Sequence, residues 1–91
     1  MLDFRIKHVQ SEHELEDALS VRRRVFIQEQ SVPESIERDG FDDWQPDRCD
    51  VLHVVGYLGD EPVAAGRVVL QMPGYDYPKI GRIAVLQSLR G

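Results

Sequence analysis

The stretch KIGRIAVL at residues 79–86, followed at once by QSLRG at residues 87–91, decides the fold that this chain is expected to adopt. The first stretch is rich in isoleucine, alanine, valine and leucine, and it predicts a strand. The second predicts the entrance to a glycine-rich turn and the N-terminus of a helix. Free backbone N–H groups and the helix dipole point at one place there, which favours anion binding. Together the two stretches predict a strand that leads into an anion-binding turn.

Upstream, the sequence predicts a strand followed by a helix. Apolar and polar side chains alternate over residues 2–9, which is typical of a half-buried strand. One face of this strand carries Leu2, Phe4, Ile6 and His8. Ser11 then opens a helix, because Glu14 follows it at the spacing of a capping box. Apolar residues at helical spacing give the helix one buried stripe and carry it to about residues 28–30.

The middle of the chain predicts a short helical turn, a polar loop and a hairpin. Proline is tolerated in a first helical turn, so residues 32–34 (VPE) can start one, and it is expected to end at Asp39-Gly40. Trp44, in the loop at residues 41–50, either caps the core or lines a cleft, and we favour the core. The remaining segments are a strand, a turn, a strand, a loop and a strand, at residues 51–58, 59–62, 63–71, 72–78 and 79–86.

This order of elements is strand–helix–short helix–strand–strand–strand. It predicts a mixed α+β fold, between the α/β and α+β classes, with a largely antiparallel sheet and the helical segment on one face. The 91 residues make one domain at most. The fourth strand has no outer partner in this sequence, and an apolar strand edge of that kind promotes pairing with another chain.

Composition excludes several classes of function. The net charge is −5, whereas a nucleic-acid-binding domain would carry a basic face or stripe. The three arginines at residues 22–24 have acidic neighbours and predict a solvated helix surface with local ion pairs. The single cysteine, Cys49, excludes an intramolecular disulfide. The histidines are scattered and show no metal-binding spacing, so we expect no metal site.

The sequence carries no signal for export or membrane insertion. The first five residues (MLDFR) carry charge where a signal peptide needs an apolar core. No apolar run approaches the roughly 20 residues that cross a bilayer. We therefore expect a cytoplasmic protein with no membrane partner and no nucleic-acid partner.

Three stretches of the sequence carry a resemblance to a known family through their order along the chain. They are RRRVFIQEQ at residues 22–30 with Val32-Pro33 and Asp39 after it, the strand pair HVVGY and VAAGRV at 53–57 and 63–68, and KIGRIAV at 79–85 with Leu89-Arg90-Gly91 after it. Their order and spacing resemble those of the GNAT-type N-acetyltransferases, and more closely a small bacterial ElaA-like branch. The first and third stretches are the specific ones. The resemblance covers nearly the whole chain and implies that residues 1–91 form the N-terminal portion of one GNAT domain.

The resemblance implies acetyl-CoA as co-substrate and names residues that would hold it. In the family, the fourth strand splays from its neighbour, and its backbone pairs with the pantetheine arm like an added strand. Those positions fall here on Ile83, Ala84 and Val85, with the Val85 N–H as the group that polarises the thioester carbonyl. Ile83 and Val85 can contribute to the core at the same time.

The family holds the cofactor's pyrophosphate with an Arg/Gln-x-x-Gly-x-Gly/Ala turn. Arg90 and Gly91 fit the first two positions of that pattern, and the later Gly/Ala positions are absent from this sequence. A phosphate cradle needs several successive N–H groups. We therefore expect the chain to stop inside the motif and the isolated 91 residues to bind acetyl-CoA weakly or not at all.

The acceptor side of the family's cleft begins where the first helix ends. Glu29 is the candidate general base there, although a solvated carboxylate at a helix end is the simpler interpretation. Gln30, Asp39 and His53 are candidates for acceptor contacts, and His53 on a strand can equally be structural. Arg82 occupies a position where some relatives carry an acidic base, so that base is absent here.

Three hypotheses follow. The chain is the N-terminal part of an N-acetyltransferase acting on a small amine, and incomplete as it stands. Alternatively, it is a non-catalytic half-domain that dimerises by pairing the edges of its fourth strands. The third is a truncated gene product without a function of its own.

Overall fold

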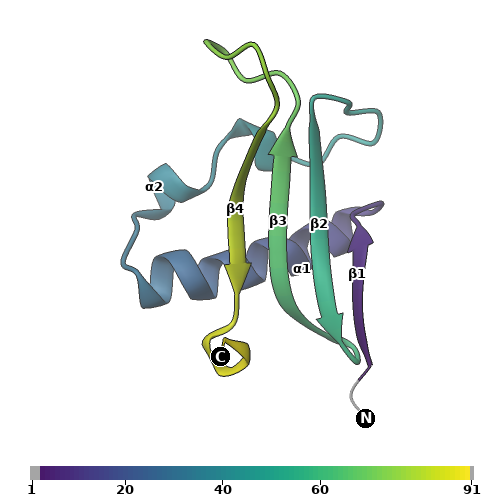
Figure 1. Ribbon diagram of the computed structural model, residues 1–91, viewed down its shortest axis with the longest axis vertical. Coiled ribbons are helices and arrows are strands. Elements are labelled where there is room, and N and C mark those ends of the chain that lie inside the picture. Colours follow the sequence, from purple (N-terminus) through teal and green to yellow (C-terminus); the bar gives the residue numbers. More distant parts are fainter. Residues whose placement is uncertain (1–2, 91) are drawn as a thin grey trace.

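A computed structural model describes residues 3–90 and has the expected order of elements (Figure 1). The sheet strands are β1 (Phe4–His8), β2 (Val51–Leu58), β3 (Glu61–Val69) and β4 (Lys79–Val85). The helical elements are α1 (Glu12–Arg22), its π-helical continuation η1 (Arg23–Glu29), α2 (Glu34–Glu37) and the 3₁₀ turns η2 (Gly40–Asp42) and η3 (Gln87–Leu89). The predicted mixed α+β fold is confirmed. Within residues 3–90, no helix has the length and apolar character to cross a membrane.

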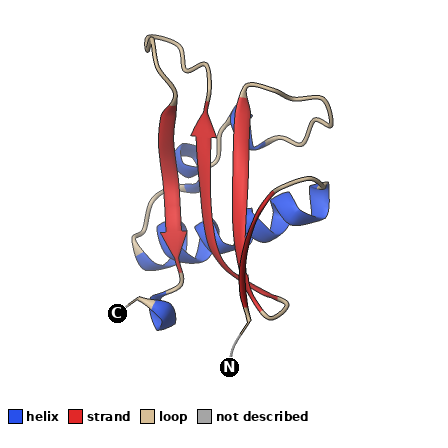
Figure 2. Ribbon diagram, turned by 45° about the vertical axis from the view of Figure 1, so that its right-hand side comes forward, coloured by secondary structure: helices blue, strands red, loops and turns tan. Residues whose placement is uncertain are grey.

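The four strands form one antiparallel sheet in the order β1-β2-β3-β4, and α1 crosses one face of it (Figures 1 and 2). A hairpin through Gly59 joins β2 to β3; this glycine has φ of +62°, which an L side chain rarely adopts. The first strand pairs with the hairpin, as its need for a neighbour predicts.

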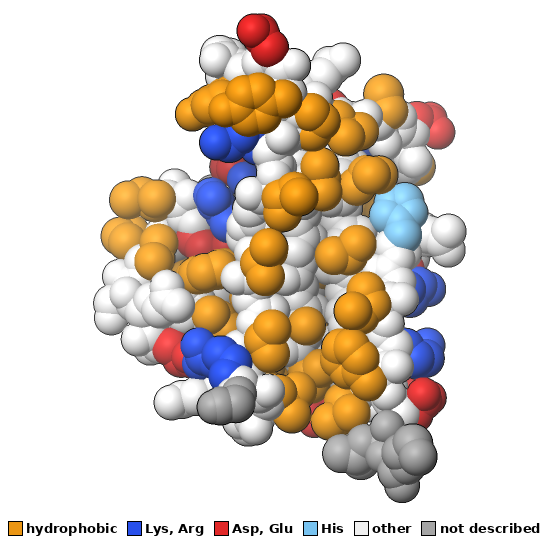
Figure 3. Space-filling model, viewed as in Figure 1, with side chains coloured by type: hydrophobic (Ala, Val, Ile, Leu, Met, Phe, Trp, Pro, Cys, Tyr) orange, Lys and Arg blue, Asp and Glu red, His pale blue; other side chains and the backbone are white. Residues whose placement is uncertain are grey.

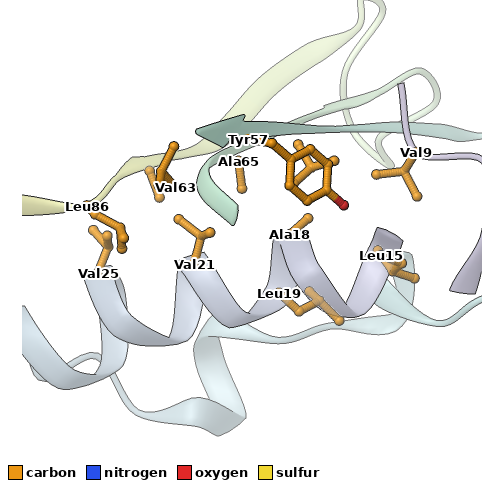
Figure 4. Packing of buried hydrophobic residues seen from close by; sticks show 12 residues of the cluster. Val9, Leu15, Ala18, Leu19, Val21, Val25, Tyr57, Val63, Ala65 and Leu86 are labelled. Atoms are coloured by element: carbon orange, nitrogen blue, oxygen red, sulfur yellow. The ribbon is translucent and has the colours of Figure 1, made fainter. Parts of the chain in front are cut away.

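The hydrophobic core lies between α1 and the sheet face that α1 covers (Figure 4). From the helical side it takes Leu15, Ala18, Leu19, Val21 and Val25, and from the sheet side Val55, Tyr57, Val63, Ala65, Ala84 and Leu86. The predicted buried stripe of the helix is therefore confirmed. Trp44 is partly buried against this core, as we favoured.

The first strand, β1, does not turn its apolar face towards the core. Phe4 is 51% exposed and Ile6 is 66% exposed, because both point away from α1. The register with β2 places Lys7 opposite Val55, on the face that α1 covers. Lys7 reaches the helix and pairs with Glu14. Leu2 lies outside the described residues.

The N-terminus of α1 is confirmed at the predicted cap. Ser11 Oγ accepts a hydrogen bond from the Glu14 N–H at 3.2 Å, and Glu14 Oε1 accepts one from the Gln10 N–H at 2.8 Å. The helix runs on into η1 without a break and ends at Glu29, within the predicted range. The π-helical winding of its second half carries no signal that we identified in the sequence.

The short second helix ends earlier than predicted. It stops at Glu37, and Asp39-Gly40 begins a new 3₁₀ turn instead of closing the helix. The reason is the side chain of Asp39, which caps that turn by accepting a hydrogen bond from the Phe41 N–H at 3.0 Å. Asp42 returns the contact, because its carboxylate accepts from the Asp39 N–H at 3.0 Å.

A buried ion network ties the segment at residues 34–42 to the helix and the sheet. Arg22 is 1% exposed and donates to Glu37 Oε1 at 2.7 Å and to Asp42 Oδ1 at 2.6 Å. Arg67, in the middle of β3, donates to Asp42 Oδ1 at 3.0 Å and to Asp39 Oδ1 at 2.7 Å. The expectation that residues 22–24 form a solvated surface is therefore wrong for Arg22, since two carboxylates neutralise it inside the fold.

Asp42 is the centre of this network. Burial alone would raise its pKa, but the Arg22 hydrogen bond, the Asp39 N–H and the Arg67 charge together lower the pKa to about 2. The carboxylate is therefore ionised throughout the physiological range. Its charge sits between two guanidinium groups, which is the condition under which a buried charge is tolerated.

Replacing Asp42 with asparagine should destabilise the fold strongly. The change leaves two buried arginines without their shared counter-charge, which costs about 3 kcal/mol or more. Asp43→Asn is the matched control, because Asp43 is exposed and belongs to the same segment. Urea unfolding followed by circular dichroism measures both. Equal stability of the two variants would contradict the assignment of the network.

Stability should also fall in acid. The folded pKa of Asp42 lies near 2 and its ordinary value is 3.8, so its contribution is complete above about pH 4 and is lost as the pH falls towards 2. The lowered pKa of Asp39, caused mainly by its hydrogen bond to Arg67, acts in the same direction. Unfolding free energies measured from pH 6 to pH 2 should therefore decrease, and Asp42→Asn should show a shallower decrease than Asp43→Asn.

Candidate functional site

The candidate site is built around an irregularity in β4. Gly81 pairs with Arg67 and Ala84 pairs with Ala65, so Arg82 and Ile83 together face the single residue Gly66. This is the two-against-one arrangement of a β-bulge. Arg82 takes up the distortion with φ of +52°, a left-handed conformation that is uncommon for a residue with a side chain. The bulge interrupts the pairing of β4 with β3 at this point, and the splay of the fourth strand stays a prediction.

The side chain of Arg82 connects the bulge to the end of α2. Its Nε donates to the carbonyl oxygen of Glu37 at 3.0 Å, and its Nη2 donates to that of Ile36 at 3.3 Å. The carboxylates of Glu37 and Asp39 lie 3.7 and 3.6 Å away. The strand β4 and the segment at residues 34–42 are therefore joined by one guanidinium. The sequence shows only an arginine after a glycine in a strand, which does not reveal this role.

The three predicted cofactor-strand residues lie at different depths. Ala84 is buried against α1, Val85 is partly buried, and Ile83 is exposed on the opposite face. The expectation that Ile83 also contributes to the core is wrong, because the bulge sets its side chain on the sheet face that no helix covers.

The outer edge of β4 is open among residues 3–90, since β3 is its one strand partner there. The Leu86 N–H donates to the carbonyl oxygen of Val63 in β3 at 3.0 Å. Successive N–H groups of a strand point to opposite edges, so the Val85 N–H points away from β3. An edge of this kind presents unpaired N–H and C=O groups to a ligand or another strand.

The predicted catalytic residue and a predicted phosphate ligand lie together. Glu29, at the end of η1, forms an ion pair with Arg90, which follows η3. The side chains are 28% and 42% exposed, so the pair is accessible to solvent. The residues after β4 form the short 3₁₀ turn η3, and the predicted helix start beyond it, with Gly91, lies outside the described residues.

The predicted acceptor residues are distributed over three places. Asp39 lies in the ion network beside Arg67 and Arg82. Gln30 is exposed at the end of η1, where its N–H donates to the Val25 carbonyl oxygen at 3.2 Å. His53 lies on β2, and the strand β3 lies between β2 and β4. The structure thus brings Asp39 close to the β4 bulge and leaves His53 apart from it.

His53 has a structural partner. Its Nε2 lies 2.9 Å from the carbonyl oxygen of Phe41, to which the neutral ring donates. Burial lowers the pKa of His53, and the charges of Arg22 and Arg67 act in the same direction, while the Phe41 contact and Asp42 oppose them. The imidazole is therefore neutral near pH 7.

A cavity of about 270 Å³ lies beside β1 and β2, near the edge of the sheet opposite β4. Its lining includes Leu15, Phe41, Trp44, Arg48 and His53. Trp44 therefore both packs on the core and lines a cavity, so the two alternatives for this residue hold together. No group of three or more metal-ligating side chains is found among residues 3–90.

Sequence reasoning missed the residues that hold residues 34–42 in place. Arg67 interrupts the apolar strand VAAGRVV, and a charged residue within such a strand indicates a buried partner. Arg22 stands at a core position of the helical stripe, which is the same signal. Neither signal identifies the partners, which come from a segment 15 to 28 residues away in the chain.

The sequence is similar to curated proteins, some of which are named as acetyltransferases. No family model matches it. It is 39% identical over 80 residues to the uncharacterised N-acetyltransferase YjcF of Bacillus subtilis, covering 88% of this chain and 51% of that protein. It is also 39% identical over 85 residues to the uncharacterised protein YyaT of the same species, covering 93% and 53%. The chain thus spans about half the length of the curated relatives it matches.

Solved structures agree in fold. Escherichia coli ElaA superposes with a TM-score of 0.77 and 31% identity, over all of this chain and 60% of that one. An acyl-CoA N-acyltransferase from Pseudomonas aeruginosa superposes with a TM-score of 0.75 and 27% identity, over 99% of this chain and 59% of that one. Both similarities extend over the whole arrangement of strands and helices described above.

Substitutions at Arg82 can separate the effect of its backbone conformation on stability from the effect of its side chain. Arg82→Gly and Arg82→Ala both remove the guanidinium, but glycine adopts a positive φ without cost. The glycine variant should therefore be more stable by about 1 kcal/mol. At Lys79, in the same strand, the same pair should show the opposite order. Urea unfolding measures all four variants, and an alanine variant at least as stable as glycine at position 82 would refute the strained bulge.

Proposed function

This chain is related to the GNAT-type N-acetyltransferases in sequence and shares their fold, and from that premise we propose that it is the N-terminal part of a cytoplasmic N-acetyltransferase. The proposed reaction moves an acetyl group from acetyl-CoA to a small amine. Half of such a domain would supply the acceptor segment and the strand that binds the pantetheine arm.

The open outer edge of β4 is the observation that carries the proposal. A pantetheine arm contains two amide groups, and a strand edge offers complementary N–H and C=O groups to them. The bulge at Arg82 gives this edge a bend next to Ile83–Val85. The backbone does the binding, so apolar side chains at these positions are compatible with it.

The chemistry requires an uncharged amine and a polarised thioester. The amine nitrogen attacks the thioester carbonyl carbon, a C–N bond forms, the C–S bond breaks, and the thiolate takes up the proton that the nitrogen gives up. In our proposal the outward Val85 N–H donates to the carbonyl oxygen as negative charge develops on it. Glu29 is the candidate that accepts the proton from the incoming ammonium.

The Glu29–Arg90 ion pair links the proposed base, Glu29, with the proposed phosphate ligand, Arg90. An acetyl-CoA pyrophosphate that binds Arg90 would have to compete with the Glu29 carboxylate. Release of Glu29 from Arg90 would in turn free the carboxylate to accept a proton. In this proposal the Arg90 guanidinium couples phosphate binding to activation of the base. On the proposed acceptor side, Arg67 and Arg82 hold Asp39 in place.

The second candidate is a non-catalytic half-domain that pairs β4 with β4 of an identical chain. The same open edge favours it, since unpaired strand edges dimerise readily. Light scattering on a size-exclusion column distinguishes the two, because a monomer at high concentration rules out the edge-paired dimer.

Acetyl-CoA at millimolar concentration should shift the amide signals of the ¹⁵N-labelled chain at Ile83 and Val85 more than at Ala84. The binding is expected to be weak, because few successive N–H groups are present for the phosphates. Pantetheine, which has no phosphates, should shift the same signals if the strand edge is the binding element. Signals at residues 83–85 that stay in place while others move would contradict the proposal.

A further inference from the structure

The cavity of about 270 Å³ beside β1 and β2 lies at the end of the core where α1 begins. Figure 4 shows Val9 and Leu15 at this end of the core cluster, and both residues line the cavity. Val51 of β2 lines it as well, and all three side chains are buried. The segment that leads into β2 adds Phe41 and Trp44. The inner wall of the cavity is therefore apolar and partly aromatic.

The aromatic part of the wall is held in place by Arg48. Its Nη1 donates to the carbonyl oxygens of Gly40 and Asp43, at 2.7 and 3.1 Å. Its Nε and Nη2 donate to the two carboxylate oxygens of Asp50, at 2.5 and 3.2 Å. One guanidinium thus ties together the two ends of the loop at residues 40–50, which carries both aromatic side chains. A wall that is fixed in this way does not have to be ordered by a ligand, which favours affinity.

The cavity offers no buried charge to a ligand. Within residues 3–90, Arg48 is the only arginine or lysine that lines the cavity, and all three of its guanidinium nitrogens already donate hydrogen bonds. Asp43 and His8 also line the cavity, but both are exposed to solvent, where an ion pair contributes little. Burying a charge without a partner is costly, so the cavity favours an uncharged ligand.

His53 supplies the cavity with a hydrogen-bond acceptor. The residue lines the cavity and is 8% exposed. Its Nε2 donates to the Phe41 carbonyl oxygen, so the free lone pair of the neutral ring is on Nδ1. Nδ1 has no hydrogen-bond partner among residues 3–90, whereas every fully buried side-chain nitrogen or oxygen in that range has one. Nδ1 is therefore not sealed inside the protein, and the cavity that the ring lines is the route to it.

We propose that this cavity binds a small uncharged aromatic molecule that carries an N–H or O–H donor, such as an indole or a phenol. The ring packs against Trp44 and Leu15, and the donor reaches His53 Nδ1. An apolar cavity of about 150 Å³ holds a benzene ring, so about 270 Å³ has room for two fused rings. Because β3 lies between β2 and β4, this site is separate from the β4 edge and does not depend on the proposed acetyl transfer.

The probe is indole, and benzothiophene is its matched control, because it has nearly the same shape and no N–H donor. Both are titrated into the 91-residue chain labelled with ¹³C and ¹⁵N. Both should show intermolecular NOEs to the methyl groups of Leu15 and Val51. Indole alone should move the ¹⁵N signal of His53 Nδ1 upfield, because that nitrogen accepts the indole N–H.

His53→Phe keeps a planar ring and removes the acceptor. In this variant the ratio of indole affinity to benzothiophene affinity should fall by about three- to tenfold, which is the usual effect of losing one hydrogen bond. The ratio cancels the difference in hydrophobicity between the two probes. His13→Phe is the control variant, because His13 is exposed on α1 and lies outside the cavity, and it should leave the ratio unchanged.

The proposal is overturned if indole gives no NOEs to Leu15 and Val51 at its solubility limit, or if the affinity ratio is the same in His53→Phe and His13→Phe. Circular dichroism shows whether His53→Phe folds. If it does not, the Nδ1 signal of the unsubstituted chain decides. An upfield shift with indole and none with benzothiophene supports the site, and equal responses to the two probes refute it.

Discussion

The placement of residues 34–42 depends on the carboxylate of Asp42, which lies between Arg22 and Arg67. These three residues belong to α1, the 3₁₀ turn η2 and β3, and Asp42 Oδ1 accepts hydrogen bonds from both arginines. A buried ion network of this kind contributes little net stability, since desolvation offsets most of the attraction. The network instead fixes the position of residues 34–42. Because this segment has few apolar side chains to bury, its charged side chains determine where it lies.

That restriction extends to β4 through Arg82. The carbonyl groups at the end of α2 are orphan acceptors, as at any helix C-terminus, and Arg82 supplies their donors. The same residue has the left-handed backbone conformation of the bulge. The candidate acceptor side and the candidate cofactor strand therefore cannot shift independently. In an acyltransferase, where two substrates must meet at one distance, such a connection serves orientation.

The two faces of the sheet differ in what covers them. One face packs on α1 and closes the core, and the other is equally apolar and has no covering layer within residues 3–90 (Figure 3). The two solved structures compared above are longer, since this chain covers 60% and 59% of them.

Local sequence signals determined the element order, the Ser11 cap and the hairpin, because each depends on residues close together in the chain. The resemblance to acetyltransferases rests on the order of three stretches along nearly the whole chain. The candidate site was predictable only as a set of positions on β4 and near Glu29. Tertiary structure alone decided that Arg22 is buried, that Ile83 faces away from the core, that Glu29 pairs with Arg90, and that His53 lies apart from β4. The physical reason is that a strand's register and an arginine's partner are set by segments distant in sequence, and a bulge of one residue reverses which side chains face the core.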